Sequence, residues 1–118
     1  MTVRQGDIYY IYLGEPTGSE PGGWHYVVVV QSDTMNKTKL LTVVACVLTT
    51  NLRRGRIPGN VTLNLHEGRL PRKSVVNISQ TVTIDKRDLG QRVGTLDYER
   101  MREIKRNIKL MLLEGRRP

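Results

Sequence analysis

The stretch YVVVVQ, residues 26–31, decides the fold of this chain. Four consecutive valines favour a β-strand, because branched side chains fit the pleated surface of a sheet. A run that is apolar at every position, and not only at every second one, predicts a strand that is buried on both faces. The other elements are therefore expected to pack around this segment.

Short β-strands are expected on either side of this stretch. GDIYYIYL, residues 6–13, is rich in aromatic and β-branched residues, which suit a half-buried strand. VTLNL, residues 61–65, alternates apolar and polar side chains, as a strand with one buried face does. The segment SDTMNKTK, residues 32–39, is expected to form a polar turn. Further strands are expected at residues 40–48, 74–78 and 81–84.

Only the C-terminal end shows a helical period. Apolar residues recur there at intervals of three and four, which predicts a helix with Asp97 as its N-cap and Gly115 at its end. A short helical turn capped by Thr83 is expected at 85–89. Strands followed by one helix predict a mainly β fold, a small twisted β-barrel or half-barrel covered by the C-terminal helix. The predicted packed face of that helix consists of Tyr98, Met101, Ile104, Ile108, Met111 and Leu112.

Length and composition limit the possible functions. The chain has 118 residues and a formal net charge of +8, which predicts a single domain over residues 1–118 and favours a nucleic-acid partner over a merely solvated surface. Its longest apolar run is far shorter than the ~20 residues of a membrane span, and no signal-like segment is evident, so a soluble, cytoplasmic protein is expected. One cysteine and two histidines cannot form a four-ligand zinc site from Cys and His alone, so a metal would need carboxylate ligands as well. No metal or cofactor is expected.

The candidate reactive groups lie in two segments. The first is GEPTGSEPGGWH, residues 14–25, whose glycines and prolines predict a long, irregular loop. The second is the end of the strand at 40–48, which is followed by two threonines and the basic run Arg53-Arg54-Gly55-Arg56. A loop that ends in His25 and a strand that ends at Thr49 meet at one sheet edge if their two strands are neighbours.

A carboxylate, an imidazole and hydroxyls beside arginines suit the cleavage of RNA by its own 2′-hydroxyl. One group accepts the 2′-proton, another protonates the leaving 5′-oxygen, and hydroxyl or cationic donors stabilise the charge that develops on the phosphate. Histidine can perform either proton transfer at neutral pH. The alternative is that His25 is a packed or solvent-exposed histidine without a catalytic task, and that Glu20 and Thr49 are ordinary loop and strand-end residues.

Several segments together resemble the MazF/PemK toxins of bacterial toxin–antitoxin modules, and the resemblance covers nearly the whole chain. The combination of a Gly-Ser-Glu loop, a valine strand and a later Thr-Ile-Asp-Lys stretch is specific, whereas each piece alone is weak. The segments are RQGDIYYIYL (4–13), GSEPGGWHYVVVVQSD (18–33), VVACVLTTN (43–51), IPGNVTL (57–63), SVVNISQTVTIDKRDLGQRVGTL (74–96) and the terminal helix.

The resemblance implies a fold and a function. The family has a small SH3-like β-barrel of the CcdB/PemK type with a C-terminal α-helix, forms homodimers, and acts as metal-independent, sequence-specific endoribonucleases on single-stranded RNA. These mRNA interferases are inhibited by a cognate acidic antitoxin of the MazE type, which lays an extended segment over the RNA groove. A net charge of +8 fits both partners.

The resemblance also assigns roles to residues. The family's loop glutamate corresponds to Glu20 and its strand-end threonine to Thr49, whereas its catalytic arginine is replaced here by His25. Val82 replaces a second arginine, and Pro21 stands where glutamine is common. The residues expected to bind RNA around this catalytic set are Ser19, Trp24, Thr50, Arg53, Arg54 and Arg56.

Three functions remain open at this point. In the first, Glu20 and His25 supply the acid and base, and Thr49 donates a hydrogen bond to the scissile phosphate. In the second, the chain is a catalytically weak or inactive member that binds RNA or antitoxin, because a neutral imidazole cannot replace the fixed charge of an arginine. The third is inhibition of DNA gyrase, as in the structurally related CcdB toxins.

Overall fold

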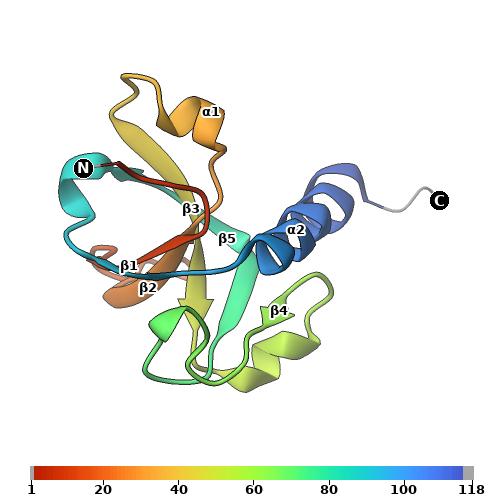
Figure 1. Cartoon of the computed structure of the whole chain (residues 1–118). Coiled ribbons are helices and arrows are strands. Elements are labelled where there is room, and N and C mark those ends of the chain that lie inside the picture. Colours follow the sequence, from red (N-terminus) through yellow and green to blue (C-terminus); the bar gives the residue numbers. More distant parts are fainter. Residues whose placement is uncertain (1, 116–118) are drawn as a thin grey trace.

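The computed structural model describes residues 2–115. One antiparallel sheet of six strands, in the order β4-β5-β3-β2-β1-β6, curves around the core, and a C-terminal helix packs against it (Figure 1). Strands β4 and β6 are its two edges, so the sheet is a half-barrel; the predicted mainly β class with a terminal helix is confirmed. The elements are β1 (Asp7–Tyr12), β2 (Trp24–Val29), α1 (Asp33–Asn36), β3 (Thr42–Thr49), β4 (Val61–Thr62), β5 (Val75–Asp85), β6 (Arg92–Thr95) and α2 (Tyr98–Asn107).

Strand β2 is central, paired with β1 on one side and with β3 on the other. Val27, Val28 and Val29 have no exposed surface, which confirms the prediction of burial on both faces. Val28 enters one hydrophobic cluster, whereas Val27 and Val29 enter a second. Because successive side chains of a strand point to opposite faces, the two clusters lie on opposite sides of the sheet. We call the side that α2 covers the helix face and the other the opposite face.

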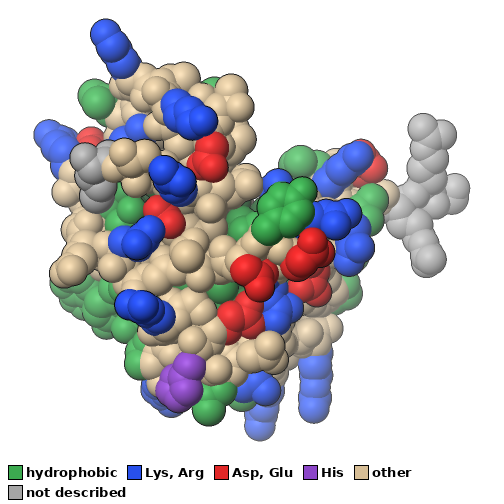
Figure 2. All heavy atoms as spheres, in the orientation of Figure 1, with side chains coloured by type: hydrophobic (Ala, Val, Ile, Leu, Met, Phe, Trp, Pro, Cys, Tyr) green, Lys and Arg blue, Asp and Glu red, His purple; other side chains and the backbone are tan. Residues whose placement is uncertain are grey.

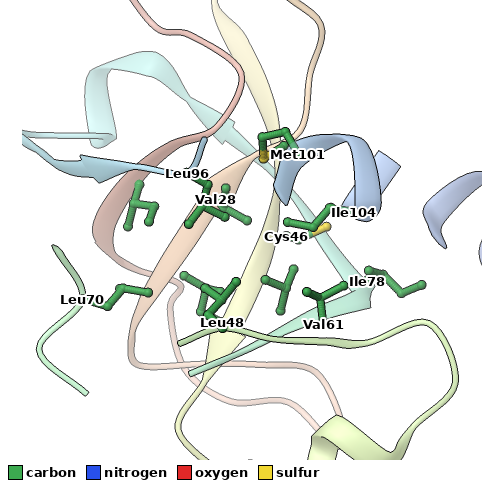
Figure 3. Close-up of a cluster of buried hydrophobic side chains, with 12 residues drawn as sticks. Val28, Cys46, Leu48, Val61, Leu70, Ile78, Leu96, Met101 and Ile104 are labelled. Atoms are coloured by element: carbon green, nitrogen blue, oxygen red, sulfur yellow. The ribbon is translucent and has the colours of Figure 1, made fainter. Parts of the chain in front are cut away.

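Helix α2 covers the helix face with its first turns. Met101 and Ile104 are buried against the cluster that contains Val28 and Cys46 (Figure 3). The Asp97 carboxylate accepts a hydrogen bond from the Arg100 backbone N–H at 2.8 Å, so the predicted N-cap is confirmed. Desolvation within this cluster raises the pKa of the Cys46 thiol to about 12.

The predicted packed face of the helix is only partly buried. Past Asn107 the helix widens into a π-helical segment, Ile108–Glu114, which ends at Gly115 with φ near 70°, as predicted for the stop. Ile108 still packs against the helix-face cluster, but Met111 and Leu112 are 51% and 42% exposed. The prediction was wrong for Met111 and Leu112, which lie in the last turns of the helix, past the residues that pack on the sheet. It was also wrong for Tyr98, the first residue of the helix, which is 72% exposed.

One half-buried ion pair, Arg100–Glu67, fixes α2 to the turn that follows β4. The Arg100 guanidinium donates from Nε and Nη2 to the two carboxylate oxygens of Glu67, at 2.7 and 2.8 Å. It also donates to Glu103 at 2.9 Å, while the Asn64 backbone N–H donates to Glu67. The guanidinium lowers the pKa of the Glu67 carboxyl, since it stabilises the ionised form.

Strand β5 differs most from the prediction. The two expected strands at 74–78 and 81–84 are one continuous strand, which pairs with β3 from Thr42↔Asp85 to Thr49↔Val75. The register shifts between Cys46 and Val47, where residues 78–80 are bulged out of the ladder. The bulge bends the strand and lets a single segment follow the curvature of the half-barrel.

Several local features also differ from the prediction. Residues 33–36 of the expected polar turn form the short helix α1, capped by Ser32. The short turn after β5 is capped by the Asp85 carboxylate and not by Thr83, because Thr83 stays in the ladder opposite Val44. Strand β6 was not predicted. Within the described residues, no helix is both long and apolar enough to cross a membrane.

Candidate functional site

The glycine-rich loop between β1 and β2 is closed at its base by backbone hydrogen bonds. The Leu13 N–H donates to the Gly23 carbonyl at 2.8 Å, and the Gly23 N–H donates to the Gly14 carbonyl at 2.7 Å. A side chain at Gly22 would overlap the backbone nitrogen of Pro16, so this close passage of two backbone segments requires glycine. The loop carries Glu20, whose side chain is exposed. The backbone N–H of Glu20 donates to the Thr17 carbonyl and closes a turn.

Glu20 lines a groove of about 540 Å³ between this loop and strand β5. The floor of the groove is apolar and is formed by residues of the opposite face, including Ile11 and Ile84. Polar residues of the bulged half of β5 form the other wall. The lining residues are Ile11, Tyr12, Leu13, Ser19, Glu20, Pro21, Ser79, Gln80, Thr81, Val82, Thr83, Ile84 and Asp88.

His25 and Thr49 lie at adjoining ends of the paired strands β2 and β3. The ladder itself ends at Val27↔Val47; the same register extended by two residues would put His25 opposite Thr49, with both on the opposite face. Nδ1 of His25 lies 3.4 Å from the Leu48 carbonyl oxygen. On its other side His25 is opposite Ile11, a groove residue. The pair therefore adjoins the groove that Glu20 lines, and the predicted meeting of the loop end and the strand end is present.

The hydroxyl of Thr49 accepts one hydrogen bond, and none that it donates is seen within residues 2–115. Its Oγ1 accepts a hydrogen bond from the Asn51 backbone N–H at 3.1 Å, and this turn leaves Thr50 exposed. A hydroxyl that already accepts from the backbone has a fixed rotamer and can donate to an anionic oxygen. This geometry suits the role that the sequence predicted for Thr49.

The three arginines lie in a short 3₁₀ turn just after Thr49. The turn, Leu52–Arg56, is capped by the Asn51 side chain, which accepts from the Arg53 N–H. Asn60 donates from Nδ2 to the Arg54 carbonyl at 3.0 Å and fixes the other end. Arg53 and Arg56 are exposed, and Arg54 is half-buried. Their side chains form a basic rim near the end of β3, outside the groove itself.

The groove lacks the positive charge of the basic rim beside it. Among the described residues that line it there are two carboxylates, Glu20 and Asp88, and neither lysine nor arginine. Val82, where the resemblance led us to expect an arginine, is one of the lining residues. A phosphate in the groove would therefore depend on cations from the rim or from a second chain.

Trp24 does not share the groove with the other candidates. It precedes His25 in β2 and so points to the helix face, where it stacks on Tyr10 with ring centroids 5.3 Å apart. Its side chain is 60% exposed. Trp24 and His25 are consecutive residues of one strand, and consecutive side chains of a strand point to opposite faces of the sheet. Trp24 therefore cannot share the face of His25.

The β5 wall of the groove was not predicted from the sequence. Gln80, Thr81 and Thr83 lie there, and the alternation of polar and apolar residues in NISQTVTI is the signal that could have assigned a solvent-facing side to this strand. Within residues 2–115, no three His, Cys, Asp or Glu side chains gather in a way that could hold a metal ion.

A half-barrel sheet with one terminal helix, and a groove beside a glycine-rich loop, is the architecture of the CcdB/PemK-like fold class. The chain belongs to the PemK-like, MazF-like toxins of type II toxin–antitoxin systems, whose family sequence pattern matches residues 4–112. It is 42% identical to the endoribonuclease MazF6 of Mycobacterium tuberculosis and to the endoribonuclease MazF2 of Mycobacterium bovis. Each match spans 112 residues, 95% of this chain and 98% of the relative.

Solved structures share the fold at lower identity. MazF from Deinococcus radiodurans superposes with a TM-score of 0.76 at 19% identity, over 95% of this chain and 97% of that one. A mycobacterial endoribonuclease in complex with its cognate antitoxin gives a TM-score of 0.72 at 23% identity, over 99% and 98% of the two chains. These likenesses establish the architecture of the half-barrel.

Proposed function

We propose that this chain is the toxin of a toxin–antitoxin pair and cleaves single-stranded RNA, as an mRNA interferase in the cytoplasm. The observation that carries the proposal is the placement of His25 beside Thr49, next to a groove lined by Glu20. Membership of a toxin family with relatives named endoribonucleases supports the same reaction.

The reaction uses three groups of this chain. The 2′-oxygen of the substrate attacks the adjacent phosphorus, the bond to the 5′-oxygen breaks, and the products carry a 2′,3′-cyclic phosphate and a 5′-hydroxyl. Glu20 and His25 act as the acid–base pair, one removing the 2′-proton and the other protonating the 5′-oxygen. Thr49 donates its hydroxyl hydrogen to a non-bridging phosphate oxygen, whose charge grows in the transition state. No bound metal is part of this scheme.

Other residues hold the strand. Ser19 lies in the same loop as Glu20 and lines the groove, whereas Thr50 and the rim arginines Arg53, Arg54 and Arg56 contact phosphates beyond Thr49. Contacts to phosphates give affinity without sequence preference, which must then come from base contacts made in the groove.

The chain's partners follow from its charge and its exposed apolar residues. An acidic antitoxin segment that covers the groove and the basic rim blocks RNA by competing for the same cations. A homodimer buries the apolar surface of the C-terminal helix, where Leu113 is 72% exposed and Met111 51%. A second chain also brings additional side chains toward a groove that is poor in cations.

The test is incubation of the purified protein with mixed-sequence RNA in EDTA. We expect fragments that end in 2′,3′-cyclic phosphate, and a loss of roughly 10²-fold or more in rate for His25→Ala. His66→Asn is the matched control, because His66 is the other histidine, lies outside the groove, and has a left-handed backbone that asparagine tolerates. An intact RNA pool with the wild-type protein would contradict the proposal.

A second function, that of a binding module without cleavage, is favoured by one observation. The described groove residues offer no cation, and Val82 and His25 both replace family arginines. This alternative expects salt-sensitive binding of RNA or an acidic peptide, with no cleavage and no growth arrest on induced expression. Growth arrest without RNA cleavage would point instead to a protein target such as gyrase.

A further inference from the structure

Four aromatic side chains form a connected cluster on the helix-face side of β1 and β2, which we call the aromatic platform: Tyr10, Tyr12, Trp24 and Tyr26. The register pairs Tyr10 with Tyr26 and Tyr12 with Trp24. The Tyr10 and Trp24 rings stack at 5.3 Å with 27° between their planes, and the Tyr10 and Tyr26 rings lie 4.4 Å apart. Cross-strand contacts therefore hold the four rings as a unit.

The platform is open to solvent. Trp24 is 60% exposed, Tyr12 49% and Tyr10 46%, and hydrophobic side chains gather on the surface over the β1–β2 end of the sheet (Figure 2). By contrast, Ile8 of β1 and the valines 27–29 of β2 have no exposed surface. Contiguous exposed aromatic surface on a small protein marks a binding site more often than a packing defect.

The platform is continuous with the groove through Tyr12. Tyr12 is one of the residues that line the groove, and its ring centroid lies 5.7 Å from that of Trp24 on the platform. Its hydroxyl donates to Glu15 at 2.8 Å, which fixes the ring at the boundary between the two surfaces. A strand that leaves the groove past Tyr12 reaches Trp24 next.

Arg92 on β6 does not flank the platform: it is paired with Tyr9, whose side chain is in the opposite-face cluster, and its guanidinium lies 3.7 Å from the Asp7 carboxylate. Positive charge reaches the platform through the overall field of a chain with a formal net charge of +8. Flat, exposed rings on a basic protein fit a chain that carries both flat bases and phosphates. An acidic peptide would match the charge but would leave the rings without a planar partner.

We propose that the aromatic platform is a base-stacking exosite, which holds the unpaired bases of the RNA that extend beyond the cleavage groove. This inference rests on the proposed function, because it assumes that single-stranded RNA is the ligand. Stacking on aromatic rings tolerates any base, so the platform contributes affinity for the substrate strand and leaves sequence preference to the groove.

Trp24 is the only tryptophan of the chain and reports directly on this site. The ligand is an oligonucleotide with 2′-O-methyl sugars, which has no 2′-nucleophile and cannot be cleaved. We expect quenching of Trp24 fluorescence on binding of an oligonucleotide long enough to span both surfaces, and little quenching by one that covers only the groove.

Substitutions then measure the contribution of the platform. By fluorescence anisotropy of a labelled long oligonucleotide, Trp24→Ala is expected to weaken binding by about tenfold, and Trp24→Phe to retain most of it. Tyr98→Ala is the matched control, because Tyr98 is an aromatic residue 72% exposed on α2, outside the platform, and it should bind like the wild type.

Three results would overturn the exosite. These are binding of the long oligonucleotide without quenching, quenching by an acidic peptide but not by RNA, and shielding of Trp24 from iodide in the free protein, which would mean that a second copy covers it. Cleavage of natural RNA in EDTA is measured in parallel. Cleavage without quenching rejects the exosite and keeps the proposed function, whereas quenching without cleavage keeps the exosite and rejects the proposed function.

Discussion

The ion pair between Arg100 and Glu67 allows a quantitative prediction. Replacing Arg100 with methionine keeps the volume of the side chain but removes the two charged hydrogen bonds that Glu67 accepts at 2.7 and 2.8 Å. Both side chains are about one-fifth exposed, at 20% and 18%, so the carboxylate left behind is only partly solvated. One hydrogen bond to a charged group is worth about 1.5–3 kcal/mol. We expect Arg100→Met to lower the free energy of unfolding by about 2–3 kcal/mol, since Asn64 still donates to Glu67.

The assay is urea unfolding followed by circular dichroism at a fixed protein concentration. Arg102→Met is the matched control, because Arg102 is 62% exposed and its pair with Glu99 is long, at 3.6 Å; such surface pairs contribute about 0–1 kcal/mol. A loss as small for Arg100→Met as for Arg102→Met would refute the argument that burial makes the Glu67 pair strong.

The same pair predicts a pH dependence. The folded-state pKa of Glu67 is lowered from its usual value of 4.5, first by the hydrogen bonds from Arg100. The stabilisation is therefore complete above that usual value and is lost as the pH falls through the lowered pKa. The difference in unfolding free energy between wild type and Arg100→Met should shrink as the pH falls below about 4. A difference that stays constant down to the lowest pH at which both proteins fold would show that charge is not its source.

Three further substitutions test the loop, the core and the groove. Gly22→Ala should reduce RNA cleavage with little change in melting temperature, because its methyl group would overlap Pro16 and displace the loop of Glu20; equal cleavage rates would contradict this. Ile104→Ala should lower the unfolding free energy by about 2–5 kcal/mol, as Ile104 is fully buried, whereas Leu110→Ala at a 46% exposed position should cost under about 1 kcal/mol. Val82→Arg adds a cation to the groove and should tighten binding of non-cleavable RNA and steepen the salt dependence by roughly one charge; unchanged binding would mean that phosphates do not enter the groove.

The strand content was predictable where the local pattern and the tertiary structure agree. The valine run at 26–31 has the composition of a doubly buried strand, and β2 is one. The single strand β5 was not predictable, because its two halves are joined by a bulge that exists only when β3 is present as a partner. Strand β6, with Gly94 in its short span, has no pattern of its own and depends on pairing with β1.

The helix shows a different limit of prediction from sequence. Spacing correctly predicts which side of a helix is apolar, but it cannot predict how far along the helix the sheet extends. Met101 and Ile104 reach the sheet, while Met111 and Leu112 have the same spacing and stay exposed.

The candidate site was predictable in part. The proximity of His25 and Thr49 followed from the assumption that their strands are neighbours, and β2 and β3 are paired; their catalytic roles stay predictions. The alternation of side chains along a strand could have predicted from the sequence that Trp24 and His25 lie on opposite faces of the sheet. The β5 wall of the groove depends on the curvature of the sheet, which brings residues about sixty positions apart in the sequence together, and no local pattern encodes that distance.

The buried thiol in the helix-face cluster has a practical consequence for spectroscopy. Cys46 has no exposed surface, and burial raises its pKa to about 12, so almost none of it is thiolate at the pH used for maleimide coupling. It is also the only cysteine in the chain. A reporter cysteine introduced at an exposed position can therefore be labelled selectively with a dye or spin probe while the protein keeps its native core.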